Sequence, residues 1–569
     1  MNRKTIRRRA TLPTEDFAPG LHPVLRRVYA GRGVHSAAEL DLGLDQLLPV
    51  STLDGLDGAV ELLLRHFASR SRILVIGDFD TDGATSSALV LRSLRRLGFV
   101  DVGYLVPNRF QFGYGLTPEI VALAAQSSPA LIITVDNGIS SHEGVAAAAR
   151  HGIEVLITDH HLPPAELPPA TAIVNPNVVN ARFGSRALAG VGVAFYVMAA
   201  LARAMRASDF NVAELLDLVA LGTVADLVPL DRNNRILVAQ GMKRMRAGRC
   251  VAGITALLEQ ANRTVQRVVA QDLAFAVAPR LNAAGRLDDM SLGIECLLTD
   301  DSGTARQLAA RLSDLNDERR EIEQRMQFEA LEAVDRLHIE SHGELGAGLC
   351  LFDESWHQGV VGLVAARVKD RVDRPVIALA RAEDGTLRGS ARSVPGVHIR
   401  DVLEAIATRH PGLIERFGGH AMAAGLTLKA DQFDRFRDAF TEEVVGWLDP
   451  AAQGIVETDG ELTPAEMTLT TALALREAGP WGSAFPEPAF DGEFVLLESR
   501  IVGDRHLKMR VRPTVSGEVF DAIAFRFIDG DAPRGELPQG PARLAYRLDV
   551  NEYLGTRRLQ LVVEHLEPS

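Results

Sequence analysis

The chain has 569 residues, of which 47% are apolar and 24% charged, a composition typical of a globular protein with about three to four domains. Its three cysteines, Cys250, Cys296 and Cys350, stand far apart and form no CxxC pair, which argues against a disulfide framework and against a thiolate zinc site. The net charge of −13 taken alone argues against nucleic-acid binding, but only weakly, because a large acidic protein can still line one groove with arginine.

The N-terminal sequence MNRKTIRRRA is basic and has no apolar stretch behind it, so it is not a secretory signal peptide. We expect a solvated tail here in preference to a nucleic-acid contact. No window contains about eighteen consecutive apolar residues, so we expect no membrane span and no membrane partner. Together with the cysteine usage, this pattern favours a cytoplasmic location.

Apolar strands alternate with helices from residue 73 onward. Thr117 is expected to be the N-cap of one helix, with Pro118 at its first position. Continuous apolar strands separated by helices predict a parallel sheet that is covered on both faces. The predicted strands are 73–79, 101–107, 131–137 and 154–160, and the predicted helices are 83–98, 117–126 and 142–152.

Residues 304–340 contain no Gly or Pro and carry one narrow apolar stripe. This pattern predicts a long helix that joins two lobes. A coiled-coil dimer is the less favoured alternative, because fewer than about four clean heptads are present. We therefore expect a monomer.

A second α/β unit follows the long helix, and after residue 454 the pattern changes to short alternating strands. These strands predict a small antiparallel barrel or sandwich. The predicted domains are an N-terminal arm over 1–45, a catalytic domain over 46–260, a connector with the long helix over 261–340, a second α/β domain over 341–450 and a barrel over 451–569.

Acidic and imidazole side chains follow three strands of the first predicted sheet. The first strand ends in GDFDTDG, with Asp78, Asp80 and Asp82, the third ends in Asp136, and the fourth ends in Asp159, His160 and His161. Asp226 lies in a later turn-like segment, TVADLVP. In an open parallel sheet ligands bind at the carboxyl ends of the strands, so these groups are expected to face one crevice.

Each of these motifs also has a plain structural explanation, because Asp-Gly commonly forms a turn and DHH can cap a helix. Their combination favours a metal site, since crowded carboxylates stay ionised only when cations compensate them. Oxygen ligands with one or two imidazoles suit Mn²⁺ or Mg²⁺. Two such ions sharing a bridging carboxylate would activate water and stabilise the leaving oxygen of a phosphoester.

Candidate phosphate-binding groups occur in four further segments. RGSARS and FGGH have plain alternatives as an exposed strand and a helix-entry turn, and the barrel sequence LKMRVR places Lys508, Arg510 and Arg512 on one face of a strand. The candidate residues are Arg109, Arg280, Asn282, Arg388, Ser390, Arg392, Gly419 and His420.

The motifs DFDTDGATSSA, TVDNGIS, TDHHLP and TVADLVP occur in the order of the DHH phosphoesterase family. RLNAAGRL, RGSARSV and ERFGGHAMAAGL resemble the second, DHHA1-like domain of that family. The resemblance extends to the bacterial single-strand-specific 5′→3′ exodeoxyribonucleases of this family over roughly residues 40–569. It implies two α/β lobes joined by a long helix, and a C-terminal OB-fold that grips the trailing strand.

The resemblance also implies roles for individual residues. Asp136 would bridge two Mn²⁺ or Mg²⁺ ions, His161 would hold or protonate the scissile phosphate, and Asp78 and Asp159 would be further ligands or their supports. Arg109, Arg280, Ser390 and Arg392 would seat the 5′ end and nearby phosphates. The implied metal ligands are Asp80, Asp82, Asp136, His160 and Asp226.

The implied function is degradation of single-stranded DNA from a 5′ end to 5′-mononucleotides in recombination and repair, alongside single-strand-binding protein and a DNA helicase. A small-substrate DHH phosphodiesterase and a non-catalytic replication scaffold are the alternatives. The sequence departs from the family in one loop, where Ala484 and Phe485 stand in place of the more frequent Gly-Asn before Pro-Glu-Pro. The contacts of that loop are therefore not implied by the resemblance.

Overall fold

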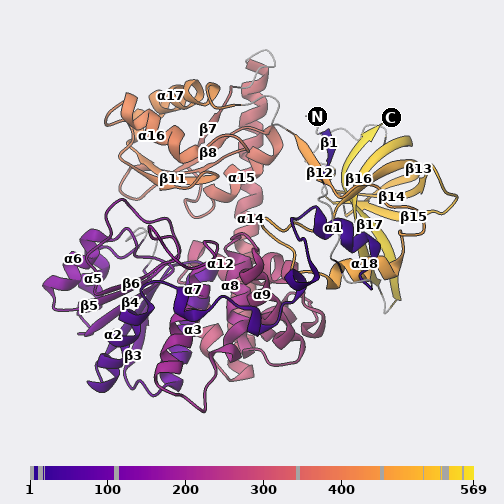
Figure 1. The fold of residues 1–569 in the computed structure, drawn as a ribbon. Coiled ribbons are helices and arrows are strands. Elements are labelled where there is room, and N and C mark those ends of the chain that lie inside the picture. Colours follow the sequence, from indigo (N-terminus) through magenta and orange to yellow (C-terminus); the bar gives the residue numbers. More distant parts are fainter. Residues whose placement is uncertain are drawn as a thin grey trace. The chain divides into compact units, whose positions relative to one another are not determined.

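The computed structural model describes residues 5–10, 17, 20–107, 115–340, 346–448, 454–503, 505–525, 527, 537–553 and 556–568. The chain divides into two compact units, which Figure 1 shows coloured along the sequence. The carboxylate unit comprises Leu12–Asn316 and Ala474–Glu487. The barrel unit comprises Met1–Thr11, Asp317–Leu473 and Pro488–Ser569. Each unit is described by itself.

The carboxylate unit is built on a five-stranded parallel sheet of order β3-β2-β4-β5-β6. All residues of β2 and β4 are buried, as their uninterrupted apolar sequences predicted. The order places β3 on one side of β2 and β4 on the other, so the chain reverses direction across the sheet between β2 and β4. The strands are β2 (Ile73–Gly77), β3 (Val102–Leu105), β4 (Leu131–Val135), β5 (Glu154–Thr158) and β6 (Ala172–Val174).

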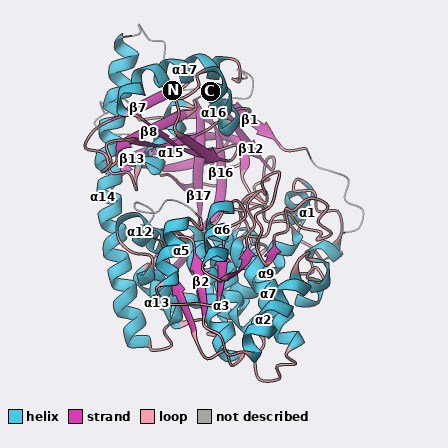
Figure 2. Ribbon diagram, turned by 90° about the vertical axis from the view of Figure 1, so that its left-hand side faces the viewer, coloured by secondary structure: helices cyan, strands magenta, loops and turns pink. Residues whose placement is uncertain are grey.

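Helices cover both faces of this sheet (Figure 2). One face packs on α5 and α6, and the other contacts α3 and α7. Thr117 is the N-cap of α5, and its side chain accepts a hydrogen bond from the backbone N–H of Ile120, which confirms the sequence prediction. These helices are α2 (Leu56–Ala68), α3 (Thr81–Arg96), α5 (Pro118–Ala125), α6 (His142–Arg150) and α7 (Gly190–Ala204).

The rest of the carboxylate unit is helical. It begins with α1, and a short π-helix over Leu273–Val277 leads into α12. The remaining helices are α1 (Pro23–Ala30), α8 (Leu216–Ala225), α9 (Arg232–Arg246), α10 (Ala252–Gln260), α11 (Ala270–Asp272), α12 (Ala278–Leu287) and α13 (Ser291–Leu298).

The predicted long helix is confirmed as α14, which runs over 39 residues from Ser302 to Glu340. It crosses the division between the two units at Asn316. Among the described residues, no helix combines the length and the apolar character needed to cross a membrane.

The barrel unit contains a second, mixed sheet of order β10-β11-β9-β8-β7. Only β7 and β8 pair in parallel in this sheet, and α16 and α17 pack with it into one apolar core. Its elements are β7 (Leu349–Phe352), α15 (Val361–Val372), β8 (Val376–Arg381), β9 (Leu387–Arg392), α16 (Ile399–Arg409), β10 (Arg416–Gly419), β11 (Ala423–Leu428) and α17 (Phe433–Val445).

The C-terminal strands close into a five-stranded barrel of order β13-β14-β15-β17-β16. All pairs are antiparallel except β15 with β17, which is the strand order of an OB-fold. The predicted barrel is therefore confirmed. Its strands are β13 (Phe490–Val502), β14 (His506–Pro513), β15 (Phe520–Ala524), β16 (Gly540–Tyr553) and β17 (Thr556–Pro568), preceded by α18 (Leu469–Glu477).

The expectation of a solvated N-terminal tail is wrong for residues 5–9. Strand β1 (Thr5–Arg8) pairs in parallel with β12 (Ile455–Thr458), and Ile6 is buried. Carboxylates of the barrel unit neutralise the basic run, since Arg8 pairs with Asp491 and Arg9 with Asp459. The basic N-terminus thus serves pairing within the protein.

Candidate active site

The predicted strand-end residues of the carboxylate unit converge at the switch point between β2 and β4. Asp78 follows β2, Asp136 follows β4, and Asp159 follows β5. The backbone N–H of Asp136 continues the sheet by donating to the carbonyl of Thr158 at 3.0 Å, although its φ is +61°. This left-handed conformation, unusual for aspartate, marks a sharp turn directly after the strand.

Asp80 and Asp82 enter the site from the first turn of α3. Asp80 is the N-cap, and its Oδ1 accepts hydrogen bonds from the backbone N–H groups of Asp82 and Gly83 at 2.9 and 3.0 Å. The motif DTDG therefore both starts the helix and places two carboxylates at the end of β2.

Asp82 is 1% exposed and is held by the N-terminus of another helix, α7. The backbone N–H groups of Gly190 and Val191 donate to its two oxygens at 2.6 and 2.9 Å. A side chain at position 190 would meet Cβ of Asp136 at 2.6 Å, so glycine is required by the close approach. The helix N-terminus stabilises the carboxylate charge.

His160 lies between carboxylates from two different elements. Its Nε2 is 3.1 Å from Oδ1 of Asp136 and 3.5 Å from Oδ2 of Asp226, the residue that ends α8. Three sets of side chains each offer ligand atoms within 4.8 Å of one another. They are Asp136 with His160 and His161, Asp82 with His160 and Asp226, and Asp78 with Asp80 and Asp136.

Asp159 differs from the other acids because hydrogen-bond donors surround it. Its Oδ1 accepts from the backbone of His160 at 2.7 Å and from Nδ1 of His161 at 2.7 Å, and its Oδ2 accepts from the backbone of Ile139 at 2.9 Å. Burial alone would raise the pKa of Asp159, but the hydrogen bond and charge of His161 bring it below its ordinary value. Asp159 is therefore suited to orient His161.

Burial and mutual repulsion raise the pKa values of the central carboxylates. Burial is the largest cause for Asp136 and Asp226, and the nearby charges of Asp82 and Asp80 raise both pKa values further. The pKa of Asp82 rises to about 7 by burial and the charge of Asp80. Hard oxygen donors that repel one another, with one imidazole among them, fit divalent cations such as Mn²⁺ or Mg²⁺.

The pKa of His161 is also raised, but for an imidazole this favours the charged form. Burial disfavours its charged form, but the hydrogen bond and charge of Asp159, with further contributions from Asp226 and Asp78, raise its pKa to about 9. The imidazolium form of His161 is thus favoured at neutral pH.

Two candidate phosphate-binding residues of the carboxylate unit, Arg280 and Asn282, lie on α12. Asn282 accepts hydrogen bonds at its Oδ1 from the backbone and hydroxyl of Thr81, both at 2.8 Å, so α12 is attached to the first turn of α3. Arg280 donates to Ser313 at 2.8 Å and to the carbonyl of Ala276 at 2.5 Å. Arg109 lies outside the described residues.

The remaining candidates lie in the barrel unit, on the strands of its mixed sheet or, for His420, directly after β10. Arg392 donates to the hydroxyl of Ser390 at 2.9 Å, and both side chains lie against Gly362 in the first turn of α15. Gly419 ends β10 at a φ of +145°, and the backbone of His420 donates to Ala423. Ala423 is opposite Arg392 in the sheet register, so these groups share one end of the sheet, and Arg388 lies further along β9.

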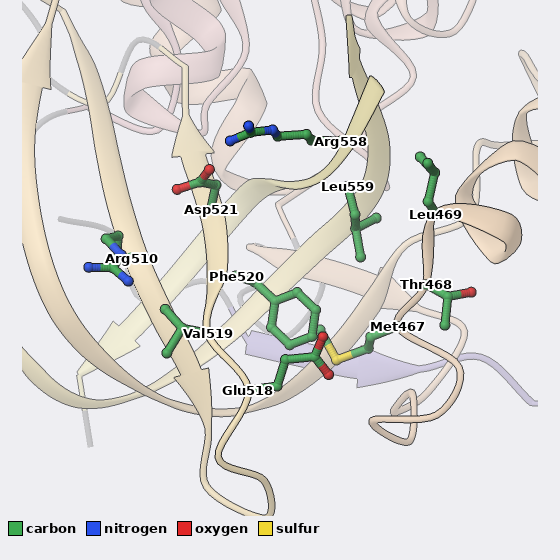
Figure 3. A pocket seen from close by; sticks show the side chains of 10 residues that line it. All are labelled: Met467, Thr468, Leu469, Arg510, Glu518, Val519, Phe520, Asp521, Arg558 and Leu559. Carbon is green, nitrogen blue, oxygen red and sulfur yellow. The ribbon is translucent and has the colours of Figure 1, made fainter. Parts of the chain in front are cut away.

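Basic residues also line the outer face of the barrel. Along β14 the residues alternate between buried and more exposed positions, and Lys508, Arg510 and Arg512 occupy the outward set, as predicted. A pocket of about 570 Å³ beside β15 adds Arg558 from β17 (Figure 3). It is lined by Met467, Thr468, Leu469, Arg510, Glu518, Val519, Phe520, Asp521, Arg558 and Leu559.

Sequence reasoning missed two kinds of support for the site. Asn175 and Asn177 donate to the carbonyls of His161 and His160 at 2.9 and 2.6 Å, and so fix the DHH turn from behind. Their signal is the Asn-Pro-Asn sequence directly after the short strand β6. The N–H groups of Gly190 and Val191 were also missed, and their signal is the glycine-rich start of α7.

Family comparisons agree with this arrangement. Residues 72–223 match the DHH family, N-terminal domain, residues 345–446 match the DHHA1 domain, and residues 458–565 match the RecJ OB domain. The parallel sheet and its strand-end carboxylates therefore belong to the N-terminal domain of a DHH-family protein.

Comparison with individual proteins identifies the chain more closely within the DHH family. The chain is 53% identical over 573 residues to the single-stranded-DNA-specific exonuclease RecJ of Escherichia coli (strain K12), with 99% of each chain covered. The relative of the same name from Bacillus subtilis (strain 168) is 32% identical over 90% of this chain and 63% of that protein. The crystal structure of RecJ in complex with Mn²⁺ from Thermus thermophilus superposes with a TM-score of 0.81 at 29% identity, covering 96% of this chain and 76% of that chain. The chain belongs to the RecJ family of single-stranded-DNA-specific exonucleases.

Proposed function

We propose that the protein hydrolyses single-stranded DNA from a 5′ end and releases 5′-mononucleotides, using two Mn²⁺ or Mg²⁺ ions. The observation that carries the proposal is the convergence on His160 of carboxylates from one strand end and two helices, namely Asp136, Asp82 and Asp226. RecJ structures with Mn²⁺ and with Mg²⁺ are known from Thermus thermophilus, which supports the choice of ions.

The proposed ligands are Asp80, Asp82, Asp136, His160 and Asp226, with Asp136 shared because it is the carboxylate that belongs to two of the three ligand sets. When bound, the two ions would activate the attacking water and neutralise charge on the phosphate. The role of the protein is to hold these carboxylates at fixed positions. Asp82 shows how this is done, because both its oxygens are fixed by the N-terminus of α7.

His161 is the proposed donor to the scissile phosphate. Asp159 accepts from Nδ1 and so directs the second ring nitrogen, Nε2, to the substrate. The raised pKa of His161 favours a proton on that nitrogen, where it can stabilise the charge that develops on a phosphate oxygen. Asp78 lies within the third ligand set and is proposed as a further ligand or its support.

The 5′ end is proposed to be seated by Arg392, Ser390 and the first turn of α15. A helix N-terminus together with a guanidinium and a hydroxyl is a suitable site for a terminal phosphate. Arg388, Gly419, His420, Arg280, Asn282 and Arg109 are proposed as further contacts to phosphates.

The barrel is proposed to hold the strand beyond the scissile bond. Lys508, Arg510 and Arg512 share its outer face, and OB-folds bind single strands through such basic faces.

We further propose action in the bacterial cytoplasm during recombination and repair, with single-strand-binding protein and a helicase that supplies single strands. These partners are supported by the substrate class alone.

The test is hydrolysis of 5′-labelled single-stranded and double-stranded DNA, with Mn²⁺ and with excess EDTA. We expect a labelled mononucleotide as the first product from the single strand only, and no product in EDTA. Equal rates on both substrates, undiminished hydrolysis in EDTA, or preferential cleavage of dinucleotides over long strands would contradict the proposal.

A further inference from the structure

The segment Ala474–Glu487 belongs to the carboxylate unit, although the residues on both sides of it belong to the barrel unit. We refer to it as the strap. It contains Ala484 and Phe485, the two residues that depart from the family pattern. Ala484 has a φ of +56°, a left-handed conformation that favours glycine.

The strap is fixed to the carboxylate unit by a stack of aromatic rings and guanidinium groups. Trp481 and Phe485, each 4% exposed, stack with centroids 5.2 Å apart and planes inclined by 12°. Tyr29 of α1 stacks on both rings, and its hydroxyl donates to the carbonyl of Ala478 at 2.8 Å. Arg235 of α9 lies 4.2 Å from the centre of the Phe485 ring. Such a buried stack holds the strap in one place on the unit.

The tip of the strap contacts the segment that follows Asp226. Gly482 and Phe485 exchange backbone hydrogen bonds to form a tight turn, and the carbonyl of Ser483 accepts from the backbone N–H of Leu230 at 2.8 Å. Leu230 is 4% exposed, and a side chain at position 482 would collide with it at 2.8 Å. The strap therefore supports Leu230, four residues after Asp226.

A second set of hydrogen bonds connects the same segment to the Asp82 side of the site. Asn234 is fully buried, and its Nδ2 donates to the carbonyl of Pro229 at 2.9 Å and to that of Ala187 at 2.5 Å. Ala187 lies three residues before Gly190, whose backbone donates to Asp82. The segment after Asp226 is thus held from both sides.

Asp226 needs such support for two physical reasons. It caps the C-terminus of α8, where the helix dipole is unfavourable for a carboxylate, and it faces the like charges of Asp82 and Asp80. In addition, Leu227 is 66% exposed and has a φ of +61°, so the residue directly after Asp226 is strained and little packed. Without a brace, repulsion would displace Asp226 from His160.

We propose that the strap is a positioning element for the metal site, in which Phe485 and the carbonyl of Ser483 hold the segment Leu227–Leu230 and thereby keep Asp226 within reach of the ions. This inference rests on the proposed assignment of Asp226 as a metal ligand. Phe485 is a positioning residue, since it acts through Leu230 and touches neither ion nor substrate.

The test measures Mn²⁺ binding to the full-length protein by electron paramagnetic resonance of the free ion, without DNA. Phe485→Ala is expected to weaken the weaker of two Mn²⁺ sites by about 10–100-fold, the range for supports of a metal ligand. Phe485→Leu, which keeps most of the volume but not the stacking plane, should weaken it less. Phe485→Leu also keeps the inference testable if Phe485→Ala does not fold.

Phe99→Ala is the matched control. Phe99 is 7% exposed and packs on Phe67 at 5.0 Å, beyond the far end of α3 from Asp80, which is about 24 Å along a helix of 16 residues. It should lower the melting temperature without changing Mn²⁺ affinity. If Phe99→Ala weakens Mn²⁺ binding as much as Phe485→Ala at equal loss of melting temperature, the effect is general destabilisation and the inference is overturned.

A double variant separates this inference from the proposed function. In an Asp226→Ala background, Phe485→Ala should have no further effect on Mn²⁺ affinity, because the residue it positions is absent. Unchanged affinity in both Phe485 variants, or an equal loss in the Asp226→Ala background, would overturn the role of the strap. If Asp226→Ala alone leaves both Mn²⁺ sites intact, the assignment of Asp226 fails first.

Discussion

Each unit contains a cluster of buried aspartates, and the two clusters differ in whether arginines neutralise the negative charge. In the barrel unit, the side chain of Asp491 is fully buried and is neutralised by Arg8 at 2.9 Å and Arg543 at 2.8 Å. Burial would raise its pKa, but hydrogen bonds from Arg8, Arg543 and Thr458 bring it below its ordinary value. The acid therefore serves the stability of the fold.

In the carboxylate unit, the groups that act most strongly on Asp136 after burial are other carboxylates, first Asp82 and then Asp80. Every one of them raises its pKa. The comparison separates a proposed metal ligand from a structural acid when both are buried: Asp491 has its counter-charge within the protein, whereas Asp136 lies among like charges that a cation would compensate.

The largest effect is expected for a substitution in the cluster of like-charged carboxylates around Asp136. Asp136→Asn should reduce nuclease activity by more than about 100-fold, the upper limit for loss of a ligand support, because it removes the carboxylate that we propose two ions share. In EDTA the same variant should melt at a higher temperature than the unmodified protein, since one repelling charge is gone. The checks are hydrolysis of 5′-labelled DNA and calorimetry, and a lower melting temperature in EDTA would contradict the comparison.

The second effect is expected for the cluster around Asp491, whose charge is neutralised by arginines. Here removal of the acid should lower the stability of the protein. Asp491→Ala leaves Arg8 and Arg543 without their shared acid, which is expected to destabilise the barrel by about 3 kcal/mol, the lower end for a broken buried pair because both arginines are partly exposed. Calorimetry of the barrel transition measures this loss. The control is Asp549→Ala, an exposed position on β16 where a change below about 0.5 kcal/mol is expected.

The two clusters should also respond oppositely to pH in EDTA. Asp82 binds a proton more tightly in the folded state, so its contribution is favourable below its unfolded pKa and is lost as pH rises toward about 7. Asp491 has a lowered folded pKa, so its contribution is present above its unfolded pKa and is lost as pH falls through the folded one. As the pH is raised from acid to neutral, the melting temperature of the carboxylate unit should fall and that of the barrel should rise. Saturating Mn²⁺ should abolish the fall for the carboxylate unit.

The smallest effect is expected for a solvent-exposed ion pair near Asp491. Arg7 pairs with Glu457 at 2.7 Å, but their side chains are 59% and 41% exposed. Arg7→Ala should therefore cost only about 0–1 kcal/mol. A loss as large as that of Asp491→Ala would mean that position on β1, and not burial of the charge, decides the contribution.

Local patterns in the sequence predicted the elements whose causes are local. The apolar strands, the Thr117 cap, the long helix α14 and the alternation along β14 all follow from the spacing of side chains. The convergence of the strand-end acids was also predictable, because parallel strands share one carboxyl edge. The roles of the individual ligands stay proposals.

Pairings between distant segments were not predictable in this way. The basic run Arg7–Arg9 has the sequence of a solvated tail, but in the structure it pairs with β12 and its arginines meet acids at positions 457, 459 and 491. The strap is a similar case, because nothing in its local sequence indicates that Phe485 packs on Arg235. One experimental consequence is that a truncation meant to remove the barrel should begin after Glu487, since removing residues 455–569 would also remove the strap, which contacts Leu230.

The pairing of β1 with β12 has a consequence for synthesis on the ribosome. Residues Thr5–Arg8 emerge before their partners Ile455–Thr458, which follow about 450 residues later, or roughly 22–90 seconds at about 5–20 residues per second. During this interval the nascent strand exposes unpaired backbone groups that invite pairing with foreign chains. Its successive arginines supply the repulsion and hydration that discourage such pairing, so the charges that later bind Asp491 and Glu457 also protect the unfinished chain.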